Sequence, residues 1–344
     1  MRILMLYAND LFDSDLEEKS IAGTQTAFIE LSRAFEQLGA VVNVYTDTLR
    51  VLEGSGRTWN QLSQVDGTVE YDLMIVNGSP YLFENFKYIK TKRKILWIHN
   101  EAKYLLYWNR LKYLLKYLPI VVFSGKYHKS TLPFFIPTGG RKLIEYGLSE
   151  AVLQSKAVDV QARNQKVYFT SNPLRSLRWI VDLWVKKIHP QVPTAELHVF
   201  AGWKTYGAWG MSVKKRMQEE IDYASMFASS NVFIREVIPK TLLFEEMRHG
   251  RAIFYRGDRA ETFCLAVAEA QALGLPAVVC DLGSMKERVE HVVTGFVVNN
   301  EVDFEAAAIR VLKDGVLFET MSLASSKKYD EMSWSAAANQ FLNI

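Results

Sequence analysis

Two glutamates separated by seven residues, Glu261 and Glu269, have the type and spacing to do chemistry. They lie in the stretch GDRAETFCLAVAEAQALGLPAVVCD, residues 257–281. Phe, Cys, Leu, Ala and Val surround the second glutamate, and a lone carboxylate buried among such residues is costly unless something hydrogen-bonds it. Glu269 therefore needs a partner, which is either a ligand hydroxyl or an arginine of the core.

The same stretch predicts a buried helix that opens on an anion-binding turn. Thr262 is a good N-cap, and Gly274 can end the helix in the left-handed conformation. A helix that is apolar nearly all round is a buried one. The backbone N–H groups of residues 263–265 then form its first turn, which is the kind of site that holds phosphates. With Glu261 just outside that turn, the order of groups suits a sugar, its phosphates and a ribose.

This pattern resembles the E-x7-E signature of retaining glycosyltransferases of family 4, which have the two-domain GT-B fold. The context ETFCLAVAEAQALGLPAVV, with a Gly-Leu-Pro turn into a Val-rich strand, makes the match specific. In that family the first glutamate contacts the donor sugar, the next backbone amides contact the sugar and diphosphate, and the second glutamate binds the ribose. The resemblance gives these roles to Glu261, to the amides of Phe263, Cys264 and Leu265, and to Glu269.

Composition indicates a globular chain of two domains. A length of 344 residues suffices for two ordinary domains, and 49% hydrophobic residues with a net charge of +3 exclude a disordered or fibrous protein. A net charge this small does not suggest a nucleic-acid partner. Two cysteines are too few for a disulfide framework, and six histidines show no metal-ligand spacing, so we expect a cytoplasmic protein with no metal site. The opening MRILMLYAND resembles a buried strand rather than a signal peptide or membrane span.

Apolar runs alternate with amphipathic stretches along the whole chain. Such βαβ repeats predict doubly wound parallel sheets, in which ligands gather at the carboxyl ends of the strands. The polar stretch 149–164 marks a boundary between two Rossmann-like domains. The resemblance makes residues 1–152 the acceptor-side domain, 153–330 the nucleotide-sugar domain and 331–344 a helix that packs on the first domain. Strands are predicted at 2–8, 41–46, 73–77, 94–98, 120–123 and 142–147, and then at 167–170, 195–202, 231–237, 252–257 and 295–299.

Two candidates lie in the first domain. Gly23, at the start of the first long helix, could bring bare amides to a phosphate, and the family has a glycine-rich loop there. The alternative is a glycine that lets the helix start close to the sheet. His99, in WIHNE, follows the fourth predicted strand, where many family members have a histidine that contacts the sugar or reacting centre. The alternative is a histidine held by backbone groups without a chemical role.

The second domain departs from the family where an Arg and a Lys usually clamp the diphosphate. The pair Ser171-Asn172 stands where the family has Gly-Arg, and Arg175 falls near the position of the family's lysine. Arg178 is the reserve candidate for the same role. An arginine at a helix start is poorly placed against the helix dipole, which favours an anionic partner; a solvated surface arginine is the alternative. In relatives the loop around Val237 contacts the nucleotide base through its backbone, so the base cannot be inferred.

Residues 86–129 form an unusually basic segment. They contain eleven lysines and arginines against one acid, Glu101, with tyrosine, tryptophan and leucine interleaved. Such a segment could lie on an anionic membrane surface, which would suit a lipid-linked acceptor. An ordinary helix with leucines in the core and lysines in solvent is the alternative.

The resemblance implies a retaining, metal-independent enzyme that moves a sugar from a UDP- or GDP-type donor to a saccharide or lipid-linked hydroxyl, in polysaccharide or glycoconjugate synthesis. Neither cofactor nor metal is expected. Arg175 and the amides of residues 263–265 would stabilise the departing diphosphate, and Glu261 would orient the sugar. Two alternatives stay open. One is a binding protein without transfer, because Tyr146, Asn172 and Lys286 replace family residues; the other is a nucleotide-sugar epimerase or hydrolase on this fold.

Overall fold

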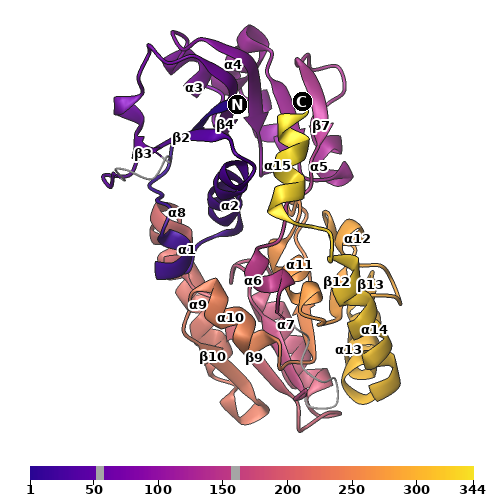
Figure 1. Ribbon diagram of the computed structural model, residues 1–344. Helices are drawn as coiled ribbons and strands as arrows, with labels where there is room; N and C mark the ends of the chain where they lie inside the picture. Colours follow the sequence, from indigo (N-terminus) through magenta and orange to yellow (C-terminus); the bar gives the residue numbers. More distant parts are fainter. Residues whose placement is uncertain (52–57, 156–162) are drawn as a thin grey trace. The chain divides into compact units, whose positions relative to one another are not determined.

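The computed structural model describes residues 1–51, 58–155 and 163–344, shown in Figure 1. This part of the chain divides into two compact units. The first contains residues 1–15, 24–147 and 333–344, and the second contains residues 16–23 and 148–332. The main chain thus leaves the first unit after Gly147 and returns to it at Ser333, five and two residues from the boundaries expected from the sequence.

A parallel sheet of seven strands forms the first unit, in the order β3-β2-β1-β4-β5-β6-β7. The sequence did not predict β3, because TWNQ has one large apolar residue, Trp59, which is fully buried. The last strand was expected at 142–147 but lies at Gly140–Leu143. The strands are β1 Arg2–Tyr7, β2 Val41–Thr46, β3 Thr58–Gln61, β4 Tyr71–Asn77, β5 Thr91–Trp97, β6 Ile120–Phe123 and β7 Gly140–Leu143.

Helices cover both faces of this sheet. The long helix α2 and the C-terminal helix α15 lie side by side (Figure 1), and the rings of Phe35 and Phe341 meet edge to face with centroids 6.1 Å apart. Successive strand residues point to opposite faces, and Leu4 and Leu6 pack in a cluster with residues of α3 and α4. The helices are α1 Asp15–Glu18, α2 Gly23–Gln37, α3 Leu82–Asn85, α4 Trp108–Tyr117, α5 Lys126–Ser130 and α15 Trp334–Leu342, with 3₁₀ turns at Leu62–Gln64 and Ala102–Leu106.

The second unit repeats the plan with six parallel strands, in the order β10-β9-β8-β11-β12-β13. Near-continuous apolar runs such as AVVC in β12 suit strands that are buried on both faces. The strands are β8 Lys166–Phe169, β9 Glu196–Phe200, β10 Val232–Arg235, β11 Ala252–Tyr255, β12 Ala277–Cys280 and β13 Gly295–Val298.

Helices connect these strands throughout the second unit. They are α6 Glu150–Leu153, α7 Leu177–Leu183, α8 Gly207–Ser212, α9 Lys214–Ser225, α10 Lys240–Met247, α11 Leu265–Ala272, α12 Met285–Arg288, α13 Glu301–Lys313 and α14 Gly315–Lys328. A π-helical turn, Trp184–Ile188, extends α7, and 3₁₀ turns lie at Trp203–Tyr206 and Ala228–Ser230. The doubly wound fold class predicted from the sequence is confirmed in both units.

Candidate active site

The strand order places a candidate site at the centre of the second sheet. The chain runs outward from β8 through β9 to β10 and restarts at β11, which pairs with the other edge of β8. Ligands of doubly wound sheets bind at such a switch point, beyond the carboxyl ends of the two strands. The loop after β8 carries Arg175, and the loop after β11 carries Glu261.

Arg175 and Glu261 meet at this point. The Nη1 atom of Arg175 lies 2.5 Å from Oε2 of Glu261, and the hydroxyl of Tyr255, the last residue of β11, donates to the same oxygen at 3.0 Å. The side chains of Arg175 and Glu261 are 33% and 10% exposed. Two residues assigned to diphosphate and sugar contacts are therefore brought together, although 86 positions separate them.

Burial and charge act in opposite directions on this pair. Burial is the largest single influence and lowers the pKa of Arg175, but the charge of Glu261 and the smaller effects of Tyr255, Tyr206 and Asp258 together outweigh it, so that the pKa rises above its usual value. For Tyr255, burial and then the charge of Glu261 both raise the pKa. Arg175 stays a cation and Tyr255 stays a hydrogen-bond donor at neutral pH. The site thus offers a permanent positive charge beside a fixed carboxylate.

The helix that carries Glu269 begins later than the sequence predicted. Thr262 is not its N-cap, because α11 begins at Leu265 and Cys264 precedes it with φ of 69°. The amides of Phe263 and Cys264 therefore lie before the first turn. A left-handed residue in front of a helix turns successive N–H groups toward one side, which is an anion-binding arrangement. The predicted anion site thus becomes a loop that leads into the helix.

Buried groups from the next loop support this segment. Gly283 has φ of 57°, and a side-chain carbon on it would lie 2.6 Å from the carbonyl oxygen of Glu261, so only glycine fits. The N–H of Ser284 donates to that carbonyl at 3.0 Å. Arg288, 1% exposed, lies 4.1 Å from the ring centroid of Phe263. The turn at Gly283 and Ser284 thus holds the backbone beside Glu261.

The loop that presents Arg175 is shaped by Asn172. Its side-chain oxygen accepts from the N–H of Leu174 at 2.9 Å, and its carbonyl accepts from the N–H of Arg175 at 2.8 Å. Asn172 is 6% exposed, so its observed contacts are within the loop. Ser176 follows with φ of 71° and precedes α7. Both loops at the switch point therefore contain a left-handed non-glycine residue directly before a helix.

Arg178, the reserve candidate, points elsewhere. Its Nε donates to Glu220 of α9 at 3.2 Å, and its guanidinium lies 3.9 Å from the ring centroid of Tyr223. The side chain is 46% exposed. Of the two arginines near this helix start, the structure brings only Arg175 to Glu261.

Glu269 has the partner that its burial demands. The ammonium group of Lys240, the first residue of α10, donates to Oε1 of Glu269, and both side chains are at least four-fifths buried. The sequence alternative named an arginine, and the structure supplies a lysine. Lys240 shares the signal used for Arg175, since a cation at a helix start opposes the dipole and favours an anionic partner. Tyr255, by contrast, looks like an ordinary residue of an apolar strand.

Val237 lies in the connection between β10 and α10. A side-chain carbon on Gly202, after β9, would lie 3.2 Å from Cγ1 of Val237, so the glycine leaves room for this valine. Val237 lies in the loop before α10, and Glu269 bonds Lys240, the first residue of α10. Both residues are therefore near the start of that helix.

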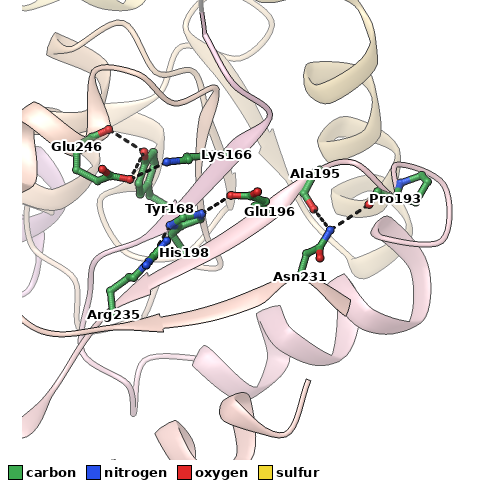
Figure 2. Close-up of polar contacts among 9 residues, drawn as sticks. All are labelled: Lys166, Tyr168, Pro193, Ala195, Glu196, His198, Asn231, Arg235 and Glu246. Carbon is green, nitrogen blue, oxygen red and sulfur yellow. Dashed lines mark hydrogen bonds and ion pairs between the residues drawn. The ribbon is translucent and has the colours of Figure 1, made fainter. Parts of the chain in front are cut away.

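Figure 2 shows two groups of polar side chains, one that joins β9 to β10 and one that joins β8 to α10. His198 is fully buried; Nε of Arg235 donates to its Nδ1 at 3.2 Å, and its Nε2 bonds Glu196 at 2.7 Å. A guanidinium can only donate, so Nδ1 carries no proton and the ring is neutral. In the second group Glu246 pairs with Lys166 at 3.1 Å, and its carbonyl accepts from the Tyr168 hydroxyl at 2.8 Å.

We expect this histidine to make stability depend on pH. Burial lowers the pKa of His198 more than its bond to Glu196 raises it. Since the folded pKa lies below the unfolded value of about 6.5, the unfolded state takes up the proton first. Stability is therefore full above about pH 6.5 and falls by at most about 1.4 kcal/mol per pH unit on acidification. Thermal melts from pH 7 to 5 should give a shallower slope for His198→Gln.

The exposed His249 provides the matched control, and His249→Gln should retain the wild-type slope. Equal slopes for both variants and the wild type would contradict this account of His198.

His99 forms a buried chain within the first unit. Its Nδ1 lies 2.5 Å from the hydroxyl of Tyr146, and its Nε2 bonds the side-chain oxygen of Asn77. Burial, with a smaller effect of His128, lowers the pKa of His99 to about 3. The ring is therefore neutral, and both nitrogens have side-chain partners. Tyr146, which replaces an expected asparagine, thus holds the histidine that the sequence singled out.

Gly23 belongs to the part of the second unit that comes from residues 16–23. A side-chain carbon on it would lie 3.3 Å from Cδ1 of Leu265, which is tight. The crowding comes from the first residue of α11 and not from a strand of the sheet, so it places Gly23 beside the start of α11.

The basic segment is partly buried and partly exposed. Leu105 and Leu114 are fully buried, whereas Tyr107 and Trp108 are 66% and 71% exposed. Lys116 and Tyr117 both bond Glu84, at 2.6 and 2.5 Å. Helices long and apolar enough to cross a bilayer are absent from residues 1–51, 58–155 and 163–344. In those same ranges no three His, Cys, Asp or Glu side chains gather as a metal site.

Comparison with known proteins agrees with this geometry. Residues 168–314 match the family model described as glycosyl transferases group 1. No curated protein matches the sequence. Three similar structures are sucrose-phosphate synthase from Thermosynechococcus elongatus (16% identity, TM-score 0.72, covering 100% of this chain and 98% of that one), Anabaena HepE in complex with UDP (14%, 0.67, 100% and 99%), and WaaG, a glycosyltransferase involved in lipopolysaccharide biosynthesis (10%, 0.67, 99% and 98%).

At these identities the structural likeness shows the fold, and the family match lies within the second unit and includes both glutamates and Arg175. Over residues 168–314 this chain therefore has the sequence pattern of the group 1 glycosyl transferases, and its fold is GT-B, as the resemblance implied.

Proposed function

We propose that the protein is a retaining glycosyltransferase that moves a sugar from a nucleoside diphosphate sugar to a hydroxyl group. One observation carries the proposal. Arg175 and Glu261 meet beyond the carboxyl ends of β8 and β11, within the part that matches the family. A cation, a carboxylate and a loop of backbone amides at a switch point suit a sugar diphosphate.

In the proposed reaction, the bond between the anomeric carbon and the diphosphate breaks, and the electron pair leaves with the phosphate oxygen. Arg175 and the amides of residues 263–265 stabilise that charge, since preorganised donors do so without reorganising. The acceptor oxygen bonds to the anomeric carbon on the same face, and its proton passes to the departing phosphate. Glu261, already bonded to Arg175 and Tyr255, orients the sugar and is not a nucleophile.

We propose a uridine or guanosine diphosphate donor. HepE binds UDP on the same fold, which favours uridine. Glu269 would accept from the ribose hydroxyls next to Lys240, and the loop at Val237 would contact the base. No metal is proposed, because Arg175 can offset the diphosphate charge. The acceptor would be a saccharide or a lipid-linked sugar, with the enzyme cytoplasmic or peripheral at a membrane.

The test is to incubate the protein with UDP-glucose, UDP-N-acetylglucosamine or GDP-mannose, with and without a panel of saccharide acceptors, and to follow both nucleotide and sugar. Transfer requires that nucleotide release depend on an acceptor and that NMR show the donor's anomeric configuration in the product. Free sugar without acceptor would instead indicate a hydrolase, an isomerised donor an epimerase, and binding without turnover a non-catalytic protein. An inverted product would overturn the retaining assignment.

A further inference from the structure

Two adjacent phenylalanines project into solvent from the first unit. Phe134 and Phe135 are 91% and 69% exposed, and their rings pack edge to face with centroids 5.7 Å apart. They lie in the connection from α5 to β7, in the sequence TLPFFIP. A single exposed apolar residue needs no explanation, but two neighbouring aromatic rings form a patch that marks an interaction surface.

The backbone of this loop is fixed by one arginine. Arg141 of β7 donates to the carbonyls of Leu132 at 2.9 Å, Pro133 at 2.7 Å and Ile136 at 2.8 Å. Leu132 is 2% exposed, and Ile136 packs against the core cluster of the unit. The residues on both sides of the phenylalanine pair are therefore fixed, and this fixed backbone directs the two rings into solvent.

The stretch of sequence that contains the loop is basic. Residues 102–144 contain no Asp or Glu but eight lysines and arginines. Helix α5, which leads into the loop, carries the exposed Lys126, and β7, which follows it, carries the exposed Lys142. The N–H of Gly139 donates to the carbonyl of Pro119 at 3.0 Å, which joins the far end of the loop to the end of the basic helix α4.

We propose that Phe134 and Phe135 insert into the interfacial region of an anionic bilayer while the surrounding cations contact its head groups. Apolar rings between lysines match such a surface, where burial of the rings and attraction of the cations add. An acidic partner protein would complement the positive charges, but it would not explain why two exposed aromatic rings lie side by side on a fixed loop. The inference deepens the proposed peripheral location by naming the inserting element, and membrane binding is measured independently of sugar transfer.

The test is flotation of the full chain with phosphatidylcholine vesicles and with vesicles that also contain phosphatidylglycerol, at about 0.1 M salt. The wild type should float with the anionic vesicles only. Phe134→Ser with Phe135→Ser should lower the partition coefficient by about tenfold per ring. Lys126→Glu with Lys142→Glu should lower it by about fivefold or more per residue. Leu49→Ser, which changes a residue that is 84% exposed elsewhere in the first unit, should float like the wild type.

Insertion also has a direct readout. In Phe134→Trp the tryptophan emission should shift to the blue with anionic vesicles and be quenched by brominated lipid chains. Wild-type protein that floats with neither vesicle, or a double serine variant that floats as well as wild type, would overturn the proposal. So would a wild-type dimer that the serine pair makes monomeric, because the rings would then bind a second copy. Calorimetry with UDP on the same samples keeps a failed donor site distinct from a failed membrane site.

Discussion

Replacement of Arg175 by alanine is expected to lower the turnover number for sugar transfer by about 10²- to 10³-fold, as the loss of one preorganised donor does at other sites of developing negative charge. Arg175 is the cation that meets Glu261 beyond β8 and β11, and its charge persists at neutral pH. The departing diphosphate would lose that charge in the transition state. Steady-state kinetics with a fixed acceptor measure the effect.

Matched variants separate chemistry from folding. Arg178→Ala removes an arginine three positions away that pairs with Glu220, so it should change turnover less than about threefold. Arg175→Lys keeps the charge but loses the planar guanidinium, and an intermediate rate is expected. The alanine variant leaves the carboxylate of Glu261 with Tyr255, so its melting temperature must be compared with wild type. Equal turnover in a folded Arg175→Ala variant would remove Arg175 from the mechanism.

The pattern of the sequence was sufficient for the fold, and it singled out two residues, Arg175 and Glu261, that the structure brings into contact. The apolar run that predicts β6, Ile120–Phe123, depends only on local residues, whereas α15, Trp334–Leu342, was expected from the family resemblance. β3 was missed because its single tryptophan leaves no alternation to detect. Periodicity therefore predicted those strands and helices that bury several side chains each.

The contacts of the site were not accessible to the same reasoning. Spacing places Glu261 and Glu269 on one segment, but Tyr255 reaches Glu261 from an apolar strand in which it looks ordinary, and the position of Lys240 at a helix start does not say which carboxylate it meets. The start of α11 was predicted two residues too early, since Thr262 has the better capping side chain. The left-handed Cys264 carries no sequence signal, because the segment around it is fixed by Gly283 and Arg288.

Replacement of Glu269 by alanine is expected to weaken nucleotide binding by about 10- to 150-fold, which corresponds to the loss of a charged hydrogen-bond partner worth about 1.5–3 kcal/mol. The physical reason is the proposed contact with the ribose hydroxyls. Calorimetric titration with UDP, GDP, ADP and dTDP measures the affinity, and the nucleotide that binds wild type most tightly also identifies the base.

The ion pair with Lys240 supplies the control that decides between a ligand contact and a purely structural pair. Lys240→Met breaks the pair but keeps the carboxylate. If Glu269 binds ribose, the Lys240→Met variant should retain nucleotide affinity within about fivefold, whereas Glu269→Ala should lose it. The reason is that leaving the carboxylate unpaired lowers folding stability more than it lowers nucleotide affinity. If the glutamate serves only to pair with Lys240, both variants should show the same loss of nucleotide affinity and the same fall in melting temperature. That result would leave Arg175 and Glu261 as the centre of the site and would move the ribose contact to another residue.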